Sequence, residues 1–296
     1  MKRIFEYNKT ISEYSYRVTD FDKITTGDFF EAIDKTVKDI KEEMSSLGLK
    51  KIALLISGID SELIAKFINL NNIEVEYFFL HIPGVNDEHK YLVESIAKLY
   101  KSKINIISIN EKTVLEKAII ETFDTCEISI PTYLVVPYIL KFIPKDFYVI
   151  VGEGDLEKTD VNKYLYIFNK KIKEYNSNNF YIPMHLSEIS YFKILKNNNL
   201  YGETNFYSRL FDTWYHILKD TRLKTNGKFF YDPKTYLLKE MCGNNFISPI
   251  KTLNFEYERS KELMQQIKYK IATASTSTNW SLFIGDVVIV PKELIF

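Results

Sequence analysis

The sequence predicts an α/β fold in which a parallel sheet is flanked by helices. From about residue 25 to residue 151, apolar segments of strand length alternate with segments in which apolar residues recur every three or four positions. Such alternation is typical of parallel sheets, because each helix carries the chain back to the start of the next strand. The first of these strands, at residues 51–56, is almost wholly apolar, as expected of a strand buried on both faces.

The expected elements follow one another in a regular order. Helical periodicity predicts helices over residues 28–44, 87–99 and 131–138, and a further helix whose apolar residues run from Leu63 to Leu70. Apolar runs rich in β-branched and aromatic residues predict strands over residues 51–56, 75–80, 104–109 and 147–151. Alternating aromatic and polar residues predict a short edge strand at residues 14–18. A ligand is expected beyond the carboxyl ends of the parallel strands.

Composition argues against several classes of protein. The 39 Lys and Arg residues balance the 39 Asp and Glu residues, so the chain has no overall attraction to nucleic acid or to acidic membranes. Cys126 and Cys242 are far apart in the sequence, which argues against a disulfide framework and a paired-cysteine metal site. No segment approaches the roughly 20 apolar residues that a membrane helix needs. We therefore expect a soluble, cytoplasmic protein, with nucleic acid disfavoured as a partner.

The most informative segment joins the strand at residues 51–56 to the next helix. The apolar run stops at Ser57-Gly58-Ile59-Asp60-Ser61, where helical periodicity begins. In such a loop, backbone N–H groups can point at phosphate oxygens, and the helix dipole favours negative charge. Gly58 has no Cβ to hinder that approach; Ser57 and Ser61 can add hydroxyl donors. Asp60 can hold Mg2+. A plain turn capped by Asp60 or Ser61 explains the same residues and stays open.

Four motifs, in order along the chain, resemble those of a known family. Residues 57–61 look like the Ser-Gly-Gly-x-Asp-Ser loop (PP-loop) of the ATP pyrophosphatases, and residues 86–98 are similar to the helix after that family's second strand. Residues 151–157 resemble the family's Ser-Gly-Glu-Gly-x-Asp-Glu, and residues 234–255 resemble a helix leading into an Arg-x-Lys-x-x-Gly-Phe stretch. The likeness spans about residues 25–255 and is greatest to the synthetase domain of asparagine synthetase, without the glutaminase domain.

The resemblance implies an adenine nucleotide alpha-hydrolase-like fold and an ATP-dependent, AMP-forming amide ligase. A carboxylate would attack the α-phosphorus of ATP, and ammonia or an amine would then displace AMP from the acyl-adenylate. The implied cofactors are ATP and Mg2+. The implied partners are a small-molecule carboxylate and ammonia or an amine, with a separate glutaminase or other partner subunit as one source of ammonia.

The resemblance also implies which residues hold the nucleotide. Those expected to bind pyrophosphate are Ser57, Gly58, Asp60 and Ser61. Leu80, within the end of the second strand, would face adenine through its backbone.

Further roles fall on later segments of the chain. Gly152 would border the nucleotide, and Asp155 would bind Mg2+ together with Asp60. Glu153 and Glu157 would bind substrate or Mg2+, or help to deprotonate the nucleophile. Lys251 would neutralise the charge that develops on the phosphate, for which a compact ammonium group is suited.

The chain departs from the family pattern at several positions. Ile56 and Ser57 stand where an ungapped alignment places the family's Ser and Gly, and Pro249 replaces the Arg two residues before the lysine. Two other hypotheses therefore stay open. One is a catalytically degenerate nucleotide-binding or interaction protein on the same fold. The other is a tRNA-modifying PP-loop enzyme that uses the thiols of Cys126 and Cys242.

The second half of the chain has a different character. Beyond about residue 155 the alternation fades, and helices are expected at residues 188–195, 206–218 and 233–241, with a hairpin at 281–290. We expect three parts: an N-terminal arm (1–24), a nucleotide-binding α/β domain (25–165) and a mostly helical C-terminal subdomain that ends in a hairpin (166–296).

Overall fold

The computed structural model describes residues 2–8, 13–19, 29–84, 86–110, 113, 117–118, 136–152, 180–183, 186–204, 206, 224–225 and 228–229. The helices expected at 206–218 and 233–241 and the hairpin expected at 281–290 lie outside these residues, except for Phe206. In the described part of the chain, no helix has the length and apolar character needed to cross a membrane.

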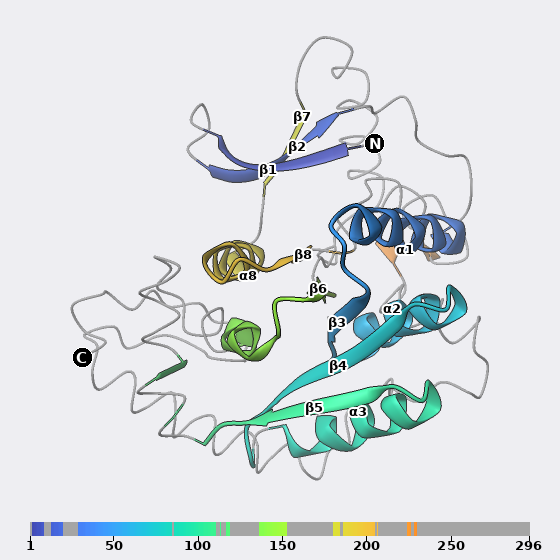
Figure 1. Ribbon diagram of the computed structural model, residues 1–296, viewed down its shortest axis with the longest axis vertical. Helices are drawn as coiled ribbons and strands as arrows, with labels where there is room; N and C mark the ends of the chain where they lie inside the picture. Colours follow the sequence, from blue (N-terminus) through green and yellow to red (C-terminus); the bar gives the residue numbers. More distant parts are fainter. Residues whose placement is uncertain are drawn as a thin grey trace.

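A five-stranded parallel sheet forms the centre of the structure, with the strand order β5-β4-β3-β6-β8 (Figure 1). Its strands are β3 (Lys51–Leu55), β4 (Glu74–His81), β5 (Lys103–Ser108), β6 (Phe147–Val151) and β8 (Tyr201–Glu203). Each strand runs parallel to its neighbours. The predicted parallel sheet flanked by helices is therefore confirmed, and it is consistent with an adenine nucleotide alpha-hydrolase-like α/β fold.

Helices cover both faces of this sheet. On one face lie α1 (Phe29–Ser46), α2 (Ile59–Leu70) and α3 (Asp87–Leu99). They share a core with alternate strand residues, among which Leu54, Tyr77 and Ile150 are fully buried. On the other side in Figure 1 lie the 3-10 helix η3 (Val136–Phe142) and α8 (Leu186–Asn197). The helix expected over residues 131–138 is described only from Val136, where it is the 3-10 helix.

The periodicity of the sequence located these elements well. β6 and α3 have the expected bounds, and α1 begins and ends within two residues of the expected helix. Ile33, Val37, Ile40 and Met44 all lie on the buried side of α1. The reason is geometric, because residues three or four apart share one side of a helix.

β8 extends the sheet beyond β6. Gly202 lies opposite Val149 in the register, and a Cβ built on Gly202 would be 2.2 Å from the Val149 carbonyl oxygen. No side chain fits at that distance, so this close approach of two strands requires a glycine. The sheet thus continues past residue 165, where the sequence led us to expect a domain boundary; the division into domains stays a prediction.

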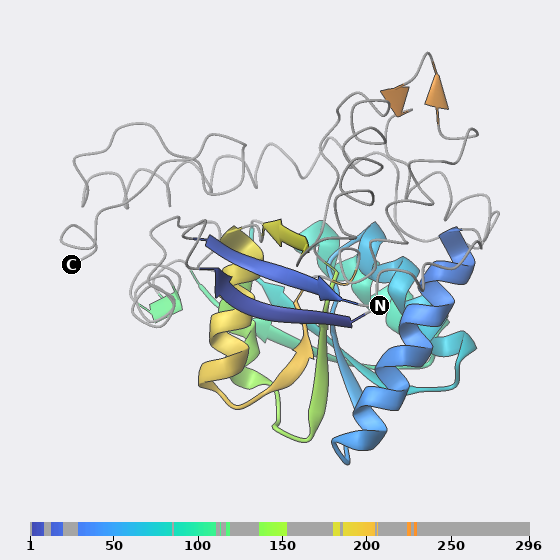
Figure 2. The same cartoon turned by 90° about the horizontal axis from the view of Figure 1, so that it is seen from above.

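A smaller antiparallel sheet lies on the β8 side of the main sheet and in front of it in Figure 2. It contains β1 (Lys2–Asn8), β2 (Glu13–Thr19) and β7 (Phe180–Pro183). The expected edge strand at residues 14–18 is within β2, which is the middle strand and not an edge, because β7 from a distant part of the chain pairs with it. A short ribbon is formed by β9 (Lys224–Thr225) and β10 (Lys228–Phe229).

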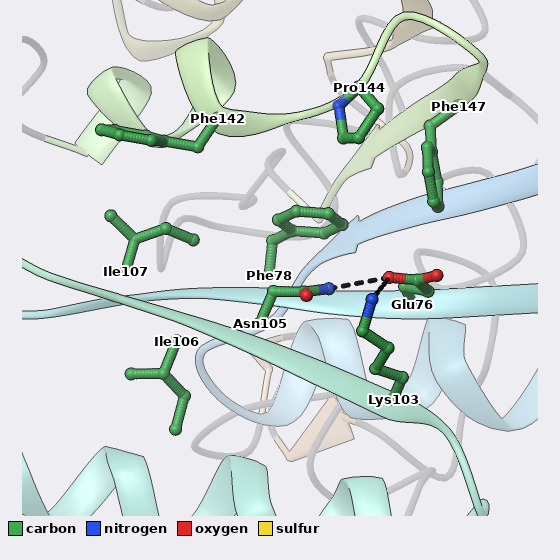
Figure 3. A pocket seen from close by; sticks show the side chains of 9 residues that line it. All are labelled: Glu76, Phe78, Lys103, Asn105, Ile106, Ile107, Phe142, Pro144 and Phe147. Atoms are coloured by element: carbon green, nitrogen blue, oxygen red, sulfur yellow. Dashed lines mark hydrogen bonds and ion pairs between the residues drawn. The ribbon is translucent and has the colours of Figure 1, made fainter.

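A hollow of about 450 Å³ lies beside β4, β5 and the start of β6 (Figure 3). Phe78, Phe142 and Phe147 surround it, and the Glu76 carboxylate lies between Lys103 and Asn105. Glu76 and Phe147 belong to the amino-terminal halves of their strands. The hollow is therefore toward the opposite end of the sheet from the expected ligand site.

Glu76 is the centre of an ion-pair network at this hollow. Its Oε2 accepts hydrogen bonds from Lys103 Nζ at 2.8 Å and from Asn105 Nδ2 at 3.0 Å, and Lys51 Nζ is 3.7 Å from its Oε1. The side chain is only 13% exposed. Burial by itself would raise the pKa of Glu76, but these partners outweigh it and hold the pKa below its ordinary value of 4.5.

We expect the free energy of unfolding to decrease as the pH falls below about 4.5. In that range the unfolded chain binds a proton at Glu76 more readily than the folded chain, and the stabilisation is lost as the pH passes through the lowered pKa. Glu76→Gln should weaken this pH dependence in urea unfolding between pH 5 and 2. The control is Glu74→Gln, whose side chain is 60% exposed. Equal pH dependence in wild type and Glu76→Gln would contradict this account.

Candidate functional site

The candidate site begins where β3 ends in the middle of the sheet. The Ile56 N–H still donates to the Phe78 carbonyl oxygen at 3.0 Å, so pairing with β4 continues one residue beyond the strand. Ser57 and Gly58 then leave the sheet, and α2 begins at Ile59. The connection is short because the helix returns directly over the sheet. Its N-terminus therefore lies at the carboxyl edge, between the ends of β4 and β6.

Ser61 holds this connection in place. Its Oγ accepts hydrogen bonds from the N–H groups of Ser57 at 3.0 Å and Gly58 at 3.2 Å. The same hydroxyl donates to the Gly58 carbonyl oxygen at 2.9 Å, and Ser61 is 4% exposed. The hydroxyl that the sequence assigned to phosphate is thus engaged within the loop, and its predicted contact with pyrophosphate stays a prediction.

The first turn of α2 is open toward solvent on the loop side. The first helical bond runs from the Glu62 N–H to the Gly58 carbonyl oxygen at 2.9 Å. The Ser57 and Gly58 N–H groups donate to Ser61 Oγ. The N–H groups of the first turn of an α-helix have no carbonyl acceptor within the helix, and the helix dipole places partial positive charge there. Ser57 is exposed and Asp60 is half-buried at this end. An anion is the ligand that such a helix end favours.

Gly58 leaves room for a ligand above the loop. Its backbone is extended, with φ −173° and ψ −153°, a conformation that any residue adopts. A Cβ built on Gly58 would have no atom within 4 Å. Gly58 thus borders open space, while its N–H donates to Ser61 Oγ, and its predicted role in leaving the backbone accessible to phosphate stays a prediction.

Gly152 closes the other side of the site. It follows β6, and a Cβ built on it would be 3.3 Å from Ile64 Cδ1 and 3.4 Å from the backbone nitrogen of Ser61. The end of β6 therefore packs directly against the first turn of α2. This contact supports the turn that Ser61 also fastens.

Two buried acids near the site were not predicted from the sequence. Glu62 on α2 is 1% exposed, and its charge adds to the burial that raises the pKa of Tyr77 to about 12. Glu203 ends β8 opposite Ile150, near Gly152, and is 3% exposed. Sequence reasoning missed Glu203 because nothing in its neighbourhood indicated that β8 joins the sheet. Glu62, by contrast, directly follows the loop motif and could have been noticed there.

The structure does not describe the other residues that were predicted to belong to the site. Glu153, Asp155, Glu157 and Lys251 lie outside the described residues. Among the residues that are described, no group of three or more His, Cys, Asp or Glu side chains is arranged to hold a metal ion. Asp60 is thus the predicted metal ligand that the structure places at the loop.

At the carboxyl ends of β4 and β5, a cluster of polar side chains joins α3 to the sheet. His81 Nε2 is 2.6 Å from Asp87 Oδ1, and His81 Nδ1 is 3.1 Å from Ser108 Oγ. The other oxygen of Asp87, Oδ2, accepts a hydrogen bond from the Gly84 N–H at 2.9 Å. His81 is 9% exposed, and both of its ring nitrogens lie within hydrogen-bond distance of a partner.

Asn86 binds the backbone of the same strand end. Its Nδ2 donates to the Leu80 carbonyl oxygen, and its Oδ1 accepts from the Ile82 N–H, both at 2.8 Å. Leu80, which the sequence assigned to adenine, is 7% exposed. Sequence reasoning did not single out Asn86, although Asn immediately before a predicted helix indicates an N-cap.

A loop and helix N-terminus at the carboxyl edge of a parallel sheet belong to the class of sites that bind anions and nucleotides. No protein-family model and no curated protein matches the sequence. Among solved structures, the chain is similar to a predicted tRNA methyltransferase subunit from Methanocaldococcus jannaschii, with 15% identity, a TM-score of 0.31 and coverage of 65% of this chain and 89% of that chain.

Two further similarities are to synthetases. One is the NMN synthetase of Francisella tularensis, with 12% identity, a TM-score of 0.35 and coverage of 67% of this chain and 97% of that chain. The other is the NH3-dependent NAD synthetase of Campylobacter jejuni, with 16% identity, a TM-score of 0.36 and coverage of 77% of this chain and 99% of that chain. None of these three structures is an asparagine synthetase. TM-scores this low carry no argument about the function of this chain.

Gly152→Ala should disturb the site without removing any of its polar groups. The added methyl group would press on the first turn of α2, and we expect a destabilisation of about 1–3 kcal/mol in urea unfolding. Gly58→Ala is the matched control. Its methyl group meets open space, so its effect should stay within about 1 kcal/mol. Equal effects of the two substitutions would contradict the close packing described at Gly152.

Proposed function

We propose that this chain binds ATP with its phosphates at the loop of residues 57–61, and that it is an ATP-dependent, AMP-forming ligase. The observation that carries the proposal is the junction of β3 and α2, where a helix N-terminus opens beside unoccupied space at Gly58. The sequence resemblance to the PP-loop family supports the same assignment.

The geometry suits a polyanion for a physical reason. Ser61 binds two loop N–H groups and the Gly58 carbonyl oxygen, so the loop is held in shape before a ligand arrives. A ligand then need not supply the free energy for ordering the loop. The N–H groups of the first helical turn and the helix dipole offer partial positive charge to phosphate.

The proposed reaction has two steps. A carboxylate oxygen attacks the α-phosphorus of ATP, and the bond to the bridging oxygen breaks so that pyrophosphate leaves. The nitrogen of ammonia or an amine then attacks the acyl carbon of the adenylate, loses a proton and expels AMP. By the sequence resemblance, Lys251 would neutralise charge on the phosphate, while Glu153 and Glu157 would bind substrate or accept the proton.

Mg2+ fits this site as an ion shared with the nucleotide. It usually binds proteins through one or two carboxylates together with substrate phosphates. Asp60, half-buried in the first turn of α2, is a carboxylate of this kind, and Asp155 is the second that the resemblance assigns. When bound, the ion would reduce the charge repulsion that phosphate presents to an attacking carboxylate.

Two alternatives share the nucleotide site. A non-catalytic nucleotide-binding or interaction protein would bind ATP without releasing pyrophosphate. A tRNA-modifying enzyme would depend on Cys126 and Cys242, both outside the described residues, and Cys126→Ser would abolish its activity.

Gly58→Val tests the phosphate site. The valine side chain fits the extended backbone but would occupy the space where phosphate must approach, so we expect at least about tenfold weaker binding of ATP and of inorganic pyrophosphate by calorimetry. Leu70→Ala, at the exposed far end of α2, should leave both affinities unchanged. Unaltered binding to a folded Gly58→Val variant would contradict the proposed phosphate site.

Pyrophosphate release tests the catalytic part of the proposal. With ATP, Mg2+ and a panel of amino-acid carboxylates, the wild type should release pyrophosphate, whereas Asp60→Ala should fall to background because a metal ligand is lost. If the wild type binds ATP but no carboxylate raises its release above the Asp60→Ala level, the result contradicts the proposed ligase and favours the non-catalytic alternative.

A further inference from the structure

The end of β4 presents two backbone groups toward the loop of residues 57–61. The Phe78 carbonyl oxygen faces β3, because it accepts the Ile56 N–H. The His81 carbonyl oxygen faces β5, because it accepts the Ile109 N–H. Backbone groups alternate in direction along a strand, so the Leu80 C=O and the Ile82 N–H face the β3 side.

β3 does not reach these two groups. Its pairing ends at Ile56, and Ser57 and Gly58 turn away into α2. The Asn86 side chain takes the place of a strand there, bonding to the Leu80 C=O and the Ile82 N–H at 2.8 Å each. Leu80 and Ile82 are each less than 9% exposed, so leaving the Leu80 C=O and the Ile82 N–H without hydrogen-bond partners would be costly.

The Asn86 carboxamide has the hydrogen-bonding pattern of an adenine edge. It offers an N–H donor and an oxygen acceptor side by side in one plane. The Watson–Crick edge of adenine offers the N6 amino donor and the N1 acceptor in the same arrangement. Hypoxanthine has the reverse pattern, with an O6 acceptor and an N1–H donor, and would bring its O6 against the Leu80 carbonyl oxygen.

Asn86 also has a second place to bind. It is the N-cap residue of α3, yet its side chain makes no hydrogen bond to the first turn of that helix. Asn is among the preferred N-cap residues because its side-chain oxygen accepts N–H groups of the first turn. A carboxamide that leaves Leu80 and Ile82 can therefore cap α3, which offsets part of the cost of leaving.

We propose that Asn86 is a built-in competitor of the nucleotide base: adenine replaces its carboxamide at the Leu80 C=O and the Ile82 N–H, and Asn86 turns toward α3. This inference rests on the proposed binding of ATP at residues 57–61. The sequence resemblance already implies that the Leu80 backbone faces adenine, and the inference adds Asn86 as the competitor for that contact. This competition also means that the affinity for ATP is lowered by the contacts that Asn86 must give up.

Asn86→Ala is the direct test, with ATP and ITP titrated into wild type and variant by calorimetry. Removing the competitor should strengthen ATP binding about three- to tenfold and leave ITP binding unchanged, so that the preference for ATP widens. The variant should be less stable than wild type without nucleotide, and ATP should raise its melting temperature by more than it raises that of wild type.

Asn71→Ala is the matched control. Asn71 also makes two side-chain hydrogen bonds, from its Nδ2 to Asp34 Oδ1 at 2.8 Å and to the Phe67 carbonyl oxygen at 2.9 Å. It lies at the far end of α2. Its replacement should lower stability without changing the affinity for either nucleotide.

Wild-type protein provides a second measurement that does not depend on a folded variant. The side-chain NH2 resonances of Asn86 should shift when ATP is added and should not shift with inorganic pyrophosphate. Unmoved Asn86 resonances, or ATP binding to Asn86→Ala that is unchanged or weaker, would overturn the inference while leaving Gly58-dependent ATP binding intact. If wild type binds neither ATP nor pyrophosphate, the phosphate site itself is wrong and the inference is overturned with it.

Discussion

The site depends on one constraint, the burial of β3 between β4 and β6. Ile52, Ala53 and Leu54 are fully buried, so this strand is fixed on both faces and both edges. It ends at Leu55, with one further hydrogen bond from Ile56, earlier than its neighbour β4, which continues to His81. β6, its other neighbour, ends level with it, because Val151 pairs with Leu55. The end of β4 therefore extends past β3 at the carboxyl edge of the sheet, where the N-terminus of α2 and Gly152 also lie.

Small polar side chains keep this edge in shape. Ser61 binds the loop after β3, Asn86 binds the end of β4, and Asp87 joins His81 to the turn at Gly84. Asn86 and Asp87 thereby give partners to groups of Leu80, Ile82 and His81, which are buried, and Ser61 fixes the more exposed loop. The carboxyl edge is thus ordered by hydrogen bonds, whereas Glu76 at the other end of the sheet is held by ion pairs.

These contacts differ in how replaceable they are. Ser61 closes a ring of hydrogen bonds within five consecutive residues, so a ligand gains nothing by breaking it. Asn86 pairs with a flat backbone edge that a planar base can match, and it has α3 as another partner. Ser61 therefore holds the loop at the proposed phosphate position, whereas Asn86 can be replaced at the proposed base position. In the proposed complex, such a division would give a rigid phosphate site and a selective base site.

The sequence alone determined the order of helices and strands from α1 to β6, because hydrophobic periodicity reports which side of each element is buried. It also located the loop at residues 57–61, because Ser, Gly and Asp after an apolar run are a local pattern. Only the tertiary structure decided the rest. Glu203 came to the edge of the sheet because β8 pairs with β6, and β2 became a middle strand because β7 pairs with it. Asn86 reached Leu80 because the turn after β4 folds back on the strand. Local patterns cannot encode the two strand pairings, since each depends on where a distant segment of the chain comes to lie. The Asn86 contact is local, but it depends on the exact conformation of the turn.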